Sequence, residues 1–198
     1  MMFKDPFDWF PRPLFANLFP MLVFAVIFID YMIPRLTNPG GQQSAERSDK
    51  GSFTVISIAT LLGIAAGIIL RFVGFGMFTG FFQWMGITIT IAGLALREWA
   101  LIKLGRFFSR TVKIETEHKV IKDGPYKWIR HPAYTGMILI YAGFVLSIGT
   151  WIGALATTII VTTSLFYRIK VEEKILMDAL GDEYQEYMSN TWRLFPGW

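Results

Sequence analysis

Residues 133–167, AYTGMILIYAGFVLSIGTWIGALATTIIVTTSLFY, form two helix-length apolar runs without a charged side chain. The runs Ala133–Ser147 and Trp151–Tyr167 meet at Ser147–Thr150, a step that is too short for anything but a tight turn. We therefore expect an antiparallel helical hairpin. Its two open ends then face the same side.

Three further apolar runs are Leu14–Ile33, Phe53–Val73 and Phe81–Ile102. About 20 mainly apolar residues are needed to cross the roughly 30 Å hydrocarbon core of a bilayer, and the five runs come near that length. Only 17% of the residues are charged, against about 25% in an ordinary soluble domain. The sequence predicts an all-α integral membrane protein, residues 1–198 forming a single domain with five transmembrane helices.

Composition excludes several classes of function. The chain has no cysteine and only two histidines, which argues against a disulfide scaffold, an iron–sulfur cluster and any His- or Cys-based metal site. Fifteen Lys and Arg residues fall on one side of the five-span arrangement and three on the other, with one inside a span. The positive-inside rule then puts the N-terminus outside and the C-terminus on the cytoplasmic face. Membrane topology thus accounts for the basic residues, and nucleic acid is not the expected partner.

The first run has no cleavage signature. Lys4, Asp5 and Asp8 precede it without a basic n-region or small-residue cleavage site, so we expect it to stay as an anchor. Among the ionisable residues inside the runs, Asp30, Arg97 and Glu98 could reach the interface or line a polar cavity.

Two GxxxG spacings occur, at Gly63–Gly67 and Gly149–Gly153. Such spacings let helices approach closely, either within one chain or between two copies. We expect packing within the chain, and dimerisation is the alternative.

The segment between the third and fourth runs is polar, basic and aromatic, and it opens the predicted catalytic region, about residues 105–198. Asp123-Gly124-Pro125 is a turn signal, and Pro132 suits the first position of a helix. His131 would then lie at a helix N-terminus, beside free backbone N–H groups that favour an anionic ligand group. The alternative is a capping or packed histidine.

A second polar cluster follows the hairpin. Arg168 and Glu172 are four residues apart and share one helix face, which the hairpin returns to the side of His131. They could also simply pair with each other on a solvated surface. Residues 172–190 then predict an amphipathic helix along the inner surface, with Trp192, Phe195 and Trp198 as an interfacial anchor.

These residues resemble the isoprenylcysteine carboxyl methyltransferase family, in particular its short five-span prokaryotic members. The resemblance covers about the last hundred residues, and related phospholipid methyltransferases share much of it. It rests on His118-Lys119-Val120-Ile121, Gly124-Pro125-Tyr126, Arg130-His131-Pro132-x-Tyr134-x-Gly136, Arg168-x-x-x-Glu172 and Gly181-Asp182-Glu183-Tyr184-x-x-Tyr187. A Gln that longer members carry before the His stretch is not evident near Thr111 or Val112.

The resemblance implies a membrane methyltransferase with a cytosolic-face pocket for S-adenosylmethionine, which leaves as S-adenosylhomocysteine, and no Rossmann domain. Arg168 and Glu172 would be catalytic, with Arg168 facing a lipophilic substrate from the bilayer. The cofactor-binding residues would be His118, Lys119, Val120, Ile121, Tyr126, His131, Pro132, Tyr134 and Glu172.

Three functions stay open at this point. The first is methylation of a prenylcysteine-like carboxylate, which is already ionised near neutral pH and needs no general base. The second is methylation of a lipid amine, which would need a base such as Glu172 or Glu173. The third is a non-enzymatic membrane scaffold or lipid-binding protein. Because Arg168 suits a carboxylate and not the removal of a proton, the first is favoured.

Overall fold

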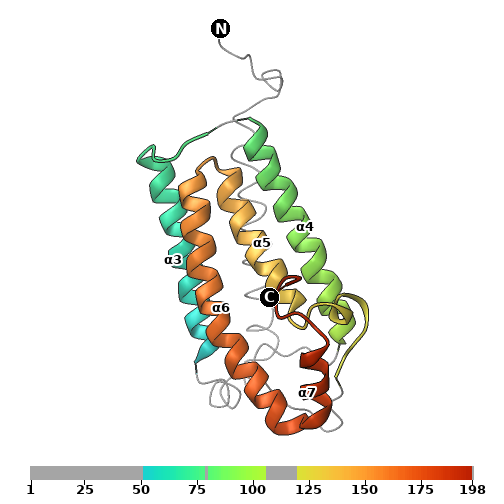
Figure 1. Ribbon diagram of the computed structural model, residues 1–198. Coiled ribbons are helices and arrows are strands. Elements are labelled where there is room, and N and C mark those ends of the chain that lie inside the picture. The colour runs from blue at the N-terminus through green and yellow to red at the C-terminus, as the bar shows by residue number, and fades with distance from the viewer. Residues whose placement is uncertain (1–50, 79, 106–119, 198) are drawn as a thin grey trace.

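The computed structural model describes residues 51–78, 80–105 and 120–197 (Figure 1). The regular elements in these ranges are helices, labelled as in Figure 1. They are α3 (Ser52–Phe72), α4 (Phe81–Leu104), the 3-10 turn η2 (Gly124–Lys127), α5 (Pro132–Ser147), α6 (Trp151–Leu180) and α7 (Asp182–Ser189).

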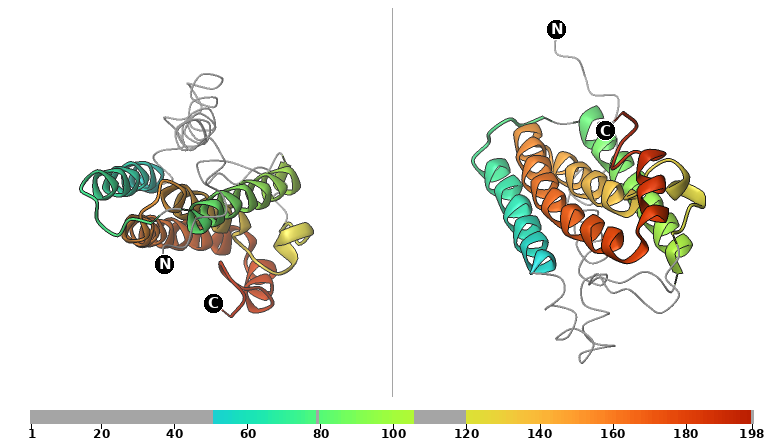
Figure 2. Two further views of the ribbon diagram at one scale, coloured as in Figure 1. Left: turned by 90° about the horizontal axis from the view of Figure 1, so that it is seen from above. Right: turned by 60° about the horizontal axis from the view of Figure 1, so that its bottom comes forward.

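The four long helices lie side by side in the order α3, α6, α5, α4, so α5 is an inner helix with a neighbour on each side (Figures 1 and 2). Helices α5 and α6 run antiparallel and are joined by the short turn at 148–150. The predicted hairpin is therefore confirmed. Its open ends lie together at the end of the bundle that also carries η2 and α7 (Figure 1).

At the closed end, the α3–α4 connection lies across the hairpin turn. The Thr150 hydroxyl donates to the Phe75 carbonyl at 2.9 Å, and the Trp151 N–H donates to the Gly76 carbonyl at 3.1 Å. Gly149 has a φ of 91° and belongs to the turn, because α6 begins only at Trp151. Of the Gly149–Gly153 spacing, Gly149 therefore lies in the turn, and only Gly153 lies in a helix, where it packs against Gly67 of the same chain.

Helix α6 is longer than its apolar run. It does not end at Tyr167 but continues to Leu180, so that the whole helix has 30 residues and is about 45 Å long at 1.5 Å per residue. Gly181, with a φ of 53°, separates it from α7. The predicted single amphipathic helix over 172–190 is therefore wrong, because its first half is the end of α6. The apolar side of α7 also packs inside the protein, with Tyr184 and Tyr187 buried.

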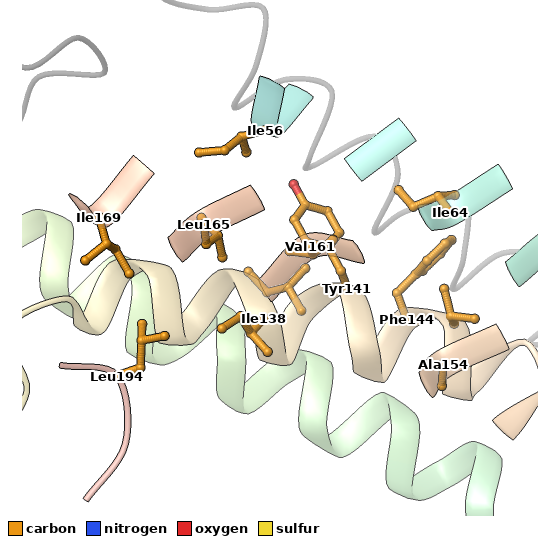
Figure 3. Close-up of a cluster of buried hydrophobic side chains, with 12 residues drawn as sticks. Ile56, Ile64, Ile138, Tyr141, Phe144, Ala154, Val161, Leu165, Ile169 and Leu194 are labelled. Atoms are coloured by element: carbon orange, nitrogen blue, oxygen red, sulfur yellow. The ribbon is translucent and has the colours of Figure 1, made fainter. Parts of the chain in front are cut away.

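The hydrophobic core lies between α3, α5 and α6 (Figure 3). Val161, Leu165 and Ile169 of α6 are completely buried and meet Ile138 and Phe144 of α5. Leu194 reaches this core from the segment after α7 and is 1% exposed. The core thus holds the hairpin together and ties the last described segment to it.

Glycines set the distance between α4 and α5. A Cβ on Gly93 would lie 2.8 Å from the carbonyl oxygen of Gly136, and a Cβ on Gly136 would lie 2.8 Å from that of Gly93. Gly86 and Gly143 face each other in the same reciprocal way, at 2.7 Å. Backbone against backbone is the closest approach that two helices make. On each helix the two glycines are seven residues apart, Gly86 and Gly93 on α4 and Gly136 and Gly143 on α5, a spacing that is visible in the sequence.

The Gly63–Gly67 spacing packs within the chain, as expected. A Cβ on Gly153 of α6 would lie 2.9 Å from the Cα of Gly67. The Thr157 hydroxyl donates to the Gly63 carbonyl at 2.7 Å. Small residues and an interhelical hydrogen bond therefore join α3 to α6.

Three described helices are long and apolar enough to cross a membrane: Thr54–Phe72, Phe81–Leu104 and Trp151–Leu180. Helix α5 is apolar but has only 16 residues, about 24 Å. The predicted span Leu14–Ile33 and Asp30 lie outside the described residues. Large apolar side chains cover the outer face of α4, among them Phe81, Ile91 and Ile102. This is the surface that a bilayer would cover.

The glycine contact between α4 and α5 can be tested by Gly93→Leu. A leucine side chain cannot fit against the Gly136 backbone, so we expect a loss of at least about 2 kcal/mol in stability. Ala95→Leu on the same helix is exposed and is the matched control. Thermal unfolding in detergent measures both, and equal midpoints for the two variants would contradict the contact.

Candidate active site

The open end of the hairpin brings together the first turn of α5 and the lower turns of α6. Pro132 starts α5 as expected, and His131 is its N-cap residue. His131 is 5% exposed, and Tyr134 stacks beside it with a ring-centroid distance of 5.6 Å. Both side chains belong to the start of α5, where they meet α6.

A chain of hydrogen bonds crosses from α5 to α6. The Tyr134 hydroxyl donates to Glu172 Oε2 at 2.7 Å, and Arg168 Nε donates to the Tyr134 oxygen at 3.2 Å. His131 Nδ1 lies 3.9 Å from the same Glu172 oxygen. The expected meeting of His131 with the Arg168–Glu172 face is therefore confirmed, and Arg168 is buried with an exposure of 3%.

A second polar cluster is centred on Glu173 and shares His131 with the first. Its carboxylate accepts from Arg130 Nε at 2.7 Å and from Arg193 at 3.1 and 2.9 Å, and His131 Nε2 lies 3.2 Å away. From the sequence, Glu173 was expected only as a possible base for a lipid amine. Its ionic contacts were hidden because Arg193 lies 20 residues further along the chain.

The segment after α7 is paired with the entrance to α5. The Arg130 N–H donates to the Trp192 carbonyl at 2.8 Å, and the His131 N–H donates to the Arg193 carbonyl at 3.2 Å. The Thr135 hydroxyl donates to the Leu194 carbonyl at 2.6 Å. Residues 191–194, here called the strap, are therefore fixed against the site by both backbone and side-chain bonds.

Tyr126 of η2 lies at the same end of the bundle as this cluster. Burial raises its pKa above the ordinary value, the negative charge of Glu172 raises it further, and the Arg97 guanidinium opposes the rise. Gly136 lets Arg97 approach, because a Cβ there would meet the Arg97 Cβ at 2.8 Å.

Arg97 therefore lies against α5 at Gly136, and whether its head group reaches the interface or lines a polar cavity stays a prediction. Glu98, its neighbour, is exposed. Among the described residues, no group of three or more His, Cys, Asp and Glu side chains could hold a metal ion.

The profile of the isoprenylcysteine carboxyl methyltransferase (ICMT) family matches residues 84–178. Over these residues, just under half of the chain, the sequence is similar to the ICMT family. The matched range holds almost all of α4 and α6 and the whole of α5, and with them Tyr126, His131, Tyr134, Arg168 and Glu172.

Curated relatives agree with the ICMT assignment. The chain is 36% identical over 104 residues to protein-S-isoprenylcysteine O-methyltransferase B of Arabidopsis thaliana, covering 52% of this chain and 53% of that protein. It is 28% identical over 188 residues to the Saccharomyces cerevisiae protein-S-isoprenylcysteine O-methyltransferase, covering 90% and 79%. The chain spans about half the length of the first curated relatives it matches.

A solved structure of the eukaryotic intramembrane Ras methyltransferase ICMT shares the fold. The TM-score is 0.59 at 22% identity, covering 95% of this chain and 68% of that one. The regular elements of the described residues are all helices, and this shared fold together with the three long apolar helices supports an integral membrane protein.

Within this ICMT framework, the predicted site residues fall into three groups. Tyr126, His131, Tyr134, Arg168 and Glu172 gather at the open end of the hairpin. Val120 and Ile121 are half-buried on the segment before η2, and Pro132 is almost completely buried, so their contact with a cofactor stays a prediction. His118 and Lys119 lie outside the described residues.

Three buried tyrosines outside the membrane-spanning helices make the site end sensitive to alkali. Burial raises the pKa of Tyr126, Tyr184 and Tyr187 above 10.0. The folded state therefore keeps these protons longer than the unfolded state, so stability is complete below about pH 10 and decreases above it. At about pH 11, each tyrosine that is neutral in the folded state and ionised in the unfolded state lowers the free energy of unfolding by about 1 kcal/mol.

Thermal unfolding at about pH 9 and pH 11 measures this decrease. Tyr187→Phe lowers stability at the lower pH, because it removes the 2.8 Å bond to the Tyr126 carbonyl, and it makes the alkaline decrease smaller. An alkaline decrease of the same size in the variant and the wild type would contradict the assignment to Tyr187.

Proposed function

We propose that this chain is a carboxyl O-methyltransferase that uses S-adenosylmethionine and acts on the carboxylate of a lipophilic, prenylcysteine-like substrate. The observation that carries the proposal is the hydrogen-bonded chain Arg168–Tyr134–Glu172 beside His131. It lies within residues 84–178, the part of the chain that matches the ICMT family profile. The curated relatives are named for this reaction.

The residues present fit a cationic methyl donor. Glu172 Oε2 and His131 Nδ1 lie 3.9 Å apart, and the Glu172 side chain is 26% exposed. A carboxylate at the end of an apolar bundle favours a positive group such as an ammonium or sulfonium. When bound, S-adenosylmethionine supplies a methyl group on a sulfonium. The residues that would hold it are His118, Lys119, Val120, Ile121, Tyr126, His131, Pro132, Tyr134 and Glu172.

Arg168 is the residue proposed to orient the substrate carboxylate. Its guanidinium is a planar fork that matches a carboxylate, and Tyr134 fixes it at Nε. Because the carboxylate is already ionised, the site does not need to remove a proton. Its work is to hold the two reactants in line and to exclude water, and the burial of Arg168 favours both.

The lipid part of the substrate is proposed to arrive from the bilayer. The site lies at one end of helices whose outer faces are apolar, and Trp99 and Ile102 of α4 are exposed near this end. The basic residues at 103, 122 and 127 favour this end as the cytoplasmic one. The proposed active site then lies at the cytoplasmic face, with membrane lipids around the helices.

The first test compares substrates. Detergent-solubilised protein is expected to bind S-adenosylhomocysteine and to transfer a radiolabelled methyl group to N-acetyl-farnesylcysteine. It should not act on N-acetyl-farnesylcysteine methyl ester, which lacks the free carboxylate. Transfer to phosphatidylethanolamine instead would establish the lipid-amine alternative, and failure to bind either cofactor form would favour a non-enzymatic scaffold.

Arg168 variants test the substrate contact. We expect Arg168→Ala to lower kcat/KM for N-acetyl-farnesylcysteine by about 100-fold, the loss of one charge-assisted contact, with S-adenosylhomocysteine affinity nearly intact. Arg168→Lys keeps the charge and should restore part of the rate. Arg71→Ala, at the closed end of the bundle, is the control. A full rate in Arg168→Ala would refute this role.

Glu172→Gln tests the donor contact. The change keeps the shape but removes the negative charge, so we expect the KM for S-adenosylmethionine to rise by about tenfold. The KM for the prenylated substrate should stay within about twofold, because Glu172 is assigned to the donor. An increase confined to the prenylated substrate would reverse the assignment.

A further inference from the structure

Glu173 is a buried carboxylate with a role beyond the reaction itself. It is 7% exposed and lies against three cationic or potentially cationic side chains, Arg130, His131 and Arg193. Arg193 binds it with two nitrogens, Nε and Nη2, so both carboxylate oxygens are occupied from this side. A carboxylate held in this way cannot rotate without losing several charge-assisted bonds.

The contact with Glu173 fixes which nitrogen of His131 carries a proton. An ionised carboxylate only accepts hydrogen bonds, so the 3.2 Å contact to His131 requires a proton on Nε2. The opposite nitrogen, Nδ1, then faces Glu172 at 3.9 Å. Turning the ring over, or moving the proton to Nδ1 alone, would break the bond to Glu173.

The position of Arg193 depends on the strap. Its carbonyl accepts from the His131 N–H, its neighbour Trp192 pairs with Arg130, and Leu194 is buried in the core. Arg193, Glu173 and His131 therefore come from the strap, α6 and the α5 cap, and meet at one point. A bond between three separate segments can transmit the position of each to the others.

We propose that Arg193 and Glu173 form a clamp that sets the ring orientation and tautomer of His131, and that this clamp tunes the affinity for the methyl donor. Arg193 and Glu173 are positioning residues, since neither is assigned to a reactant. This inference rests on the proposed function for its effect on the donor. The state of the His131 ring is a property of the protein alone.

The clamp is tested first by nitrogen-15 NMR of the imidazole rings. The chain has only two histidines, so labelled histidine gives two ring systems, and His118→Gln assigns them. We expect the His131 Nε2 to be protonated and slow to exchange with water. In Arg193→Ala and Glu173→Gln, the Nε2 proton should exchange faster and the nitrogen shifts should move toward a mixture of tautomers.

Binding measurements give the second readout. Arg193→Ala is expected to weaken S-adenosylhomocysteine binding by about tenfold, and Arg193→Lys should recover part of it. The KM for the prenylated substrate should stay within about twofold. Lys174→Ala, an exposed neighbour on α6, is the matched control. Because both residues act through one path, the double variant should bind no more weakly than Glu173→Gln alone.

The outcomes separate a clamp from an ordinary ion pair. If Arg193→Ala lowers thermal stability but leaves the His131 signals and the donor affinity of the folded protein unchanged, the clamp is overturned. If the wild type binds no donor, the proposed function fails. The NMR comparison then still decides whether Glu173 and Arg193 fix the ring.

Discussion

The hydrogen bond between Tyr134 and Glu172 joins residues 38 positions apart, and nearly every other feature of the site depends on the hairpin that makes it possible. The turn at 148–150 returns α6 along α5, and buried Val161, Leu165 and Ile169 hold the two helices in register. A change of register of one residue would turn Glu172 away from α5 by about 100°. The core therefore determines the polar geometry at its end.

Close packing elsewhere in the bundle serves the same geometry. The reciprocal glycine pairs bring α4 against α5, and at Gly136 they allow the start of the Arg97 side chain to pack directly on α5. The site thus receives charged or potentially charged residues from α4, from the segment just before α5, from α6 and from the strap. Two carboxylates one residue apart on α6 take different partners, since Glu172 faces Tyr134 while Glu173 faces the arginines. Neighbouring positions on a helix point about 100° apart, which is why one sequence step separates the two clusters.

The sequence was sufficient for the hairpin, the start of α5 at Pro132 and the meeting of His131 with Glu172, because each follows from local rules of helix length and turn chemistry. It was not sufficient for the end of α6. Charged residues after Tyr167 suggested that the span had ended, yet an amphipathic helix continues through them with Arg168 and Glu173 facing inward. The strap was also missed, since its pairing with 128–131 joins residues about 60 positions apart and leaves no periodic signal.

The length of α6 carries a further consequence. One unbroken helix of 30 residues is long and apolar enough to cross a membrane and also supplies Arg168, Glu172 and Glu173 in its second half. Tilt of a long helix adjusts to the thickness of the surrounding lipid. Because no hinge is present between the two parts of α6, a thinner or thicker bilayer changes how deep these charges sit relative to the phospholipid headgroups. Lipid composition would therefore change the surroundings of these charged side chains.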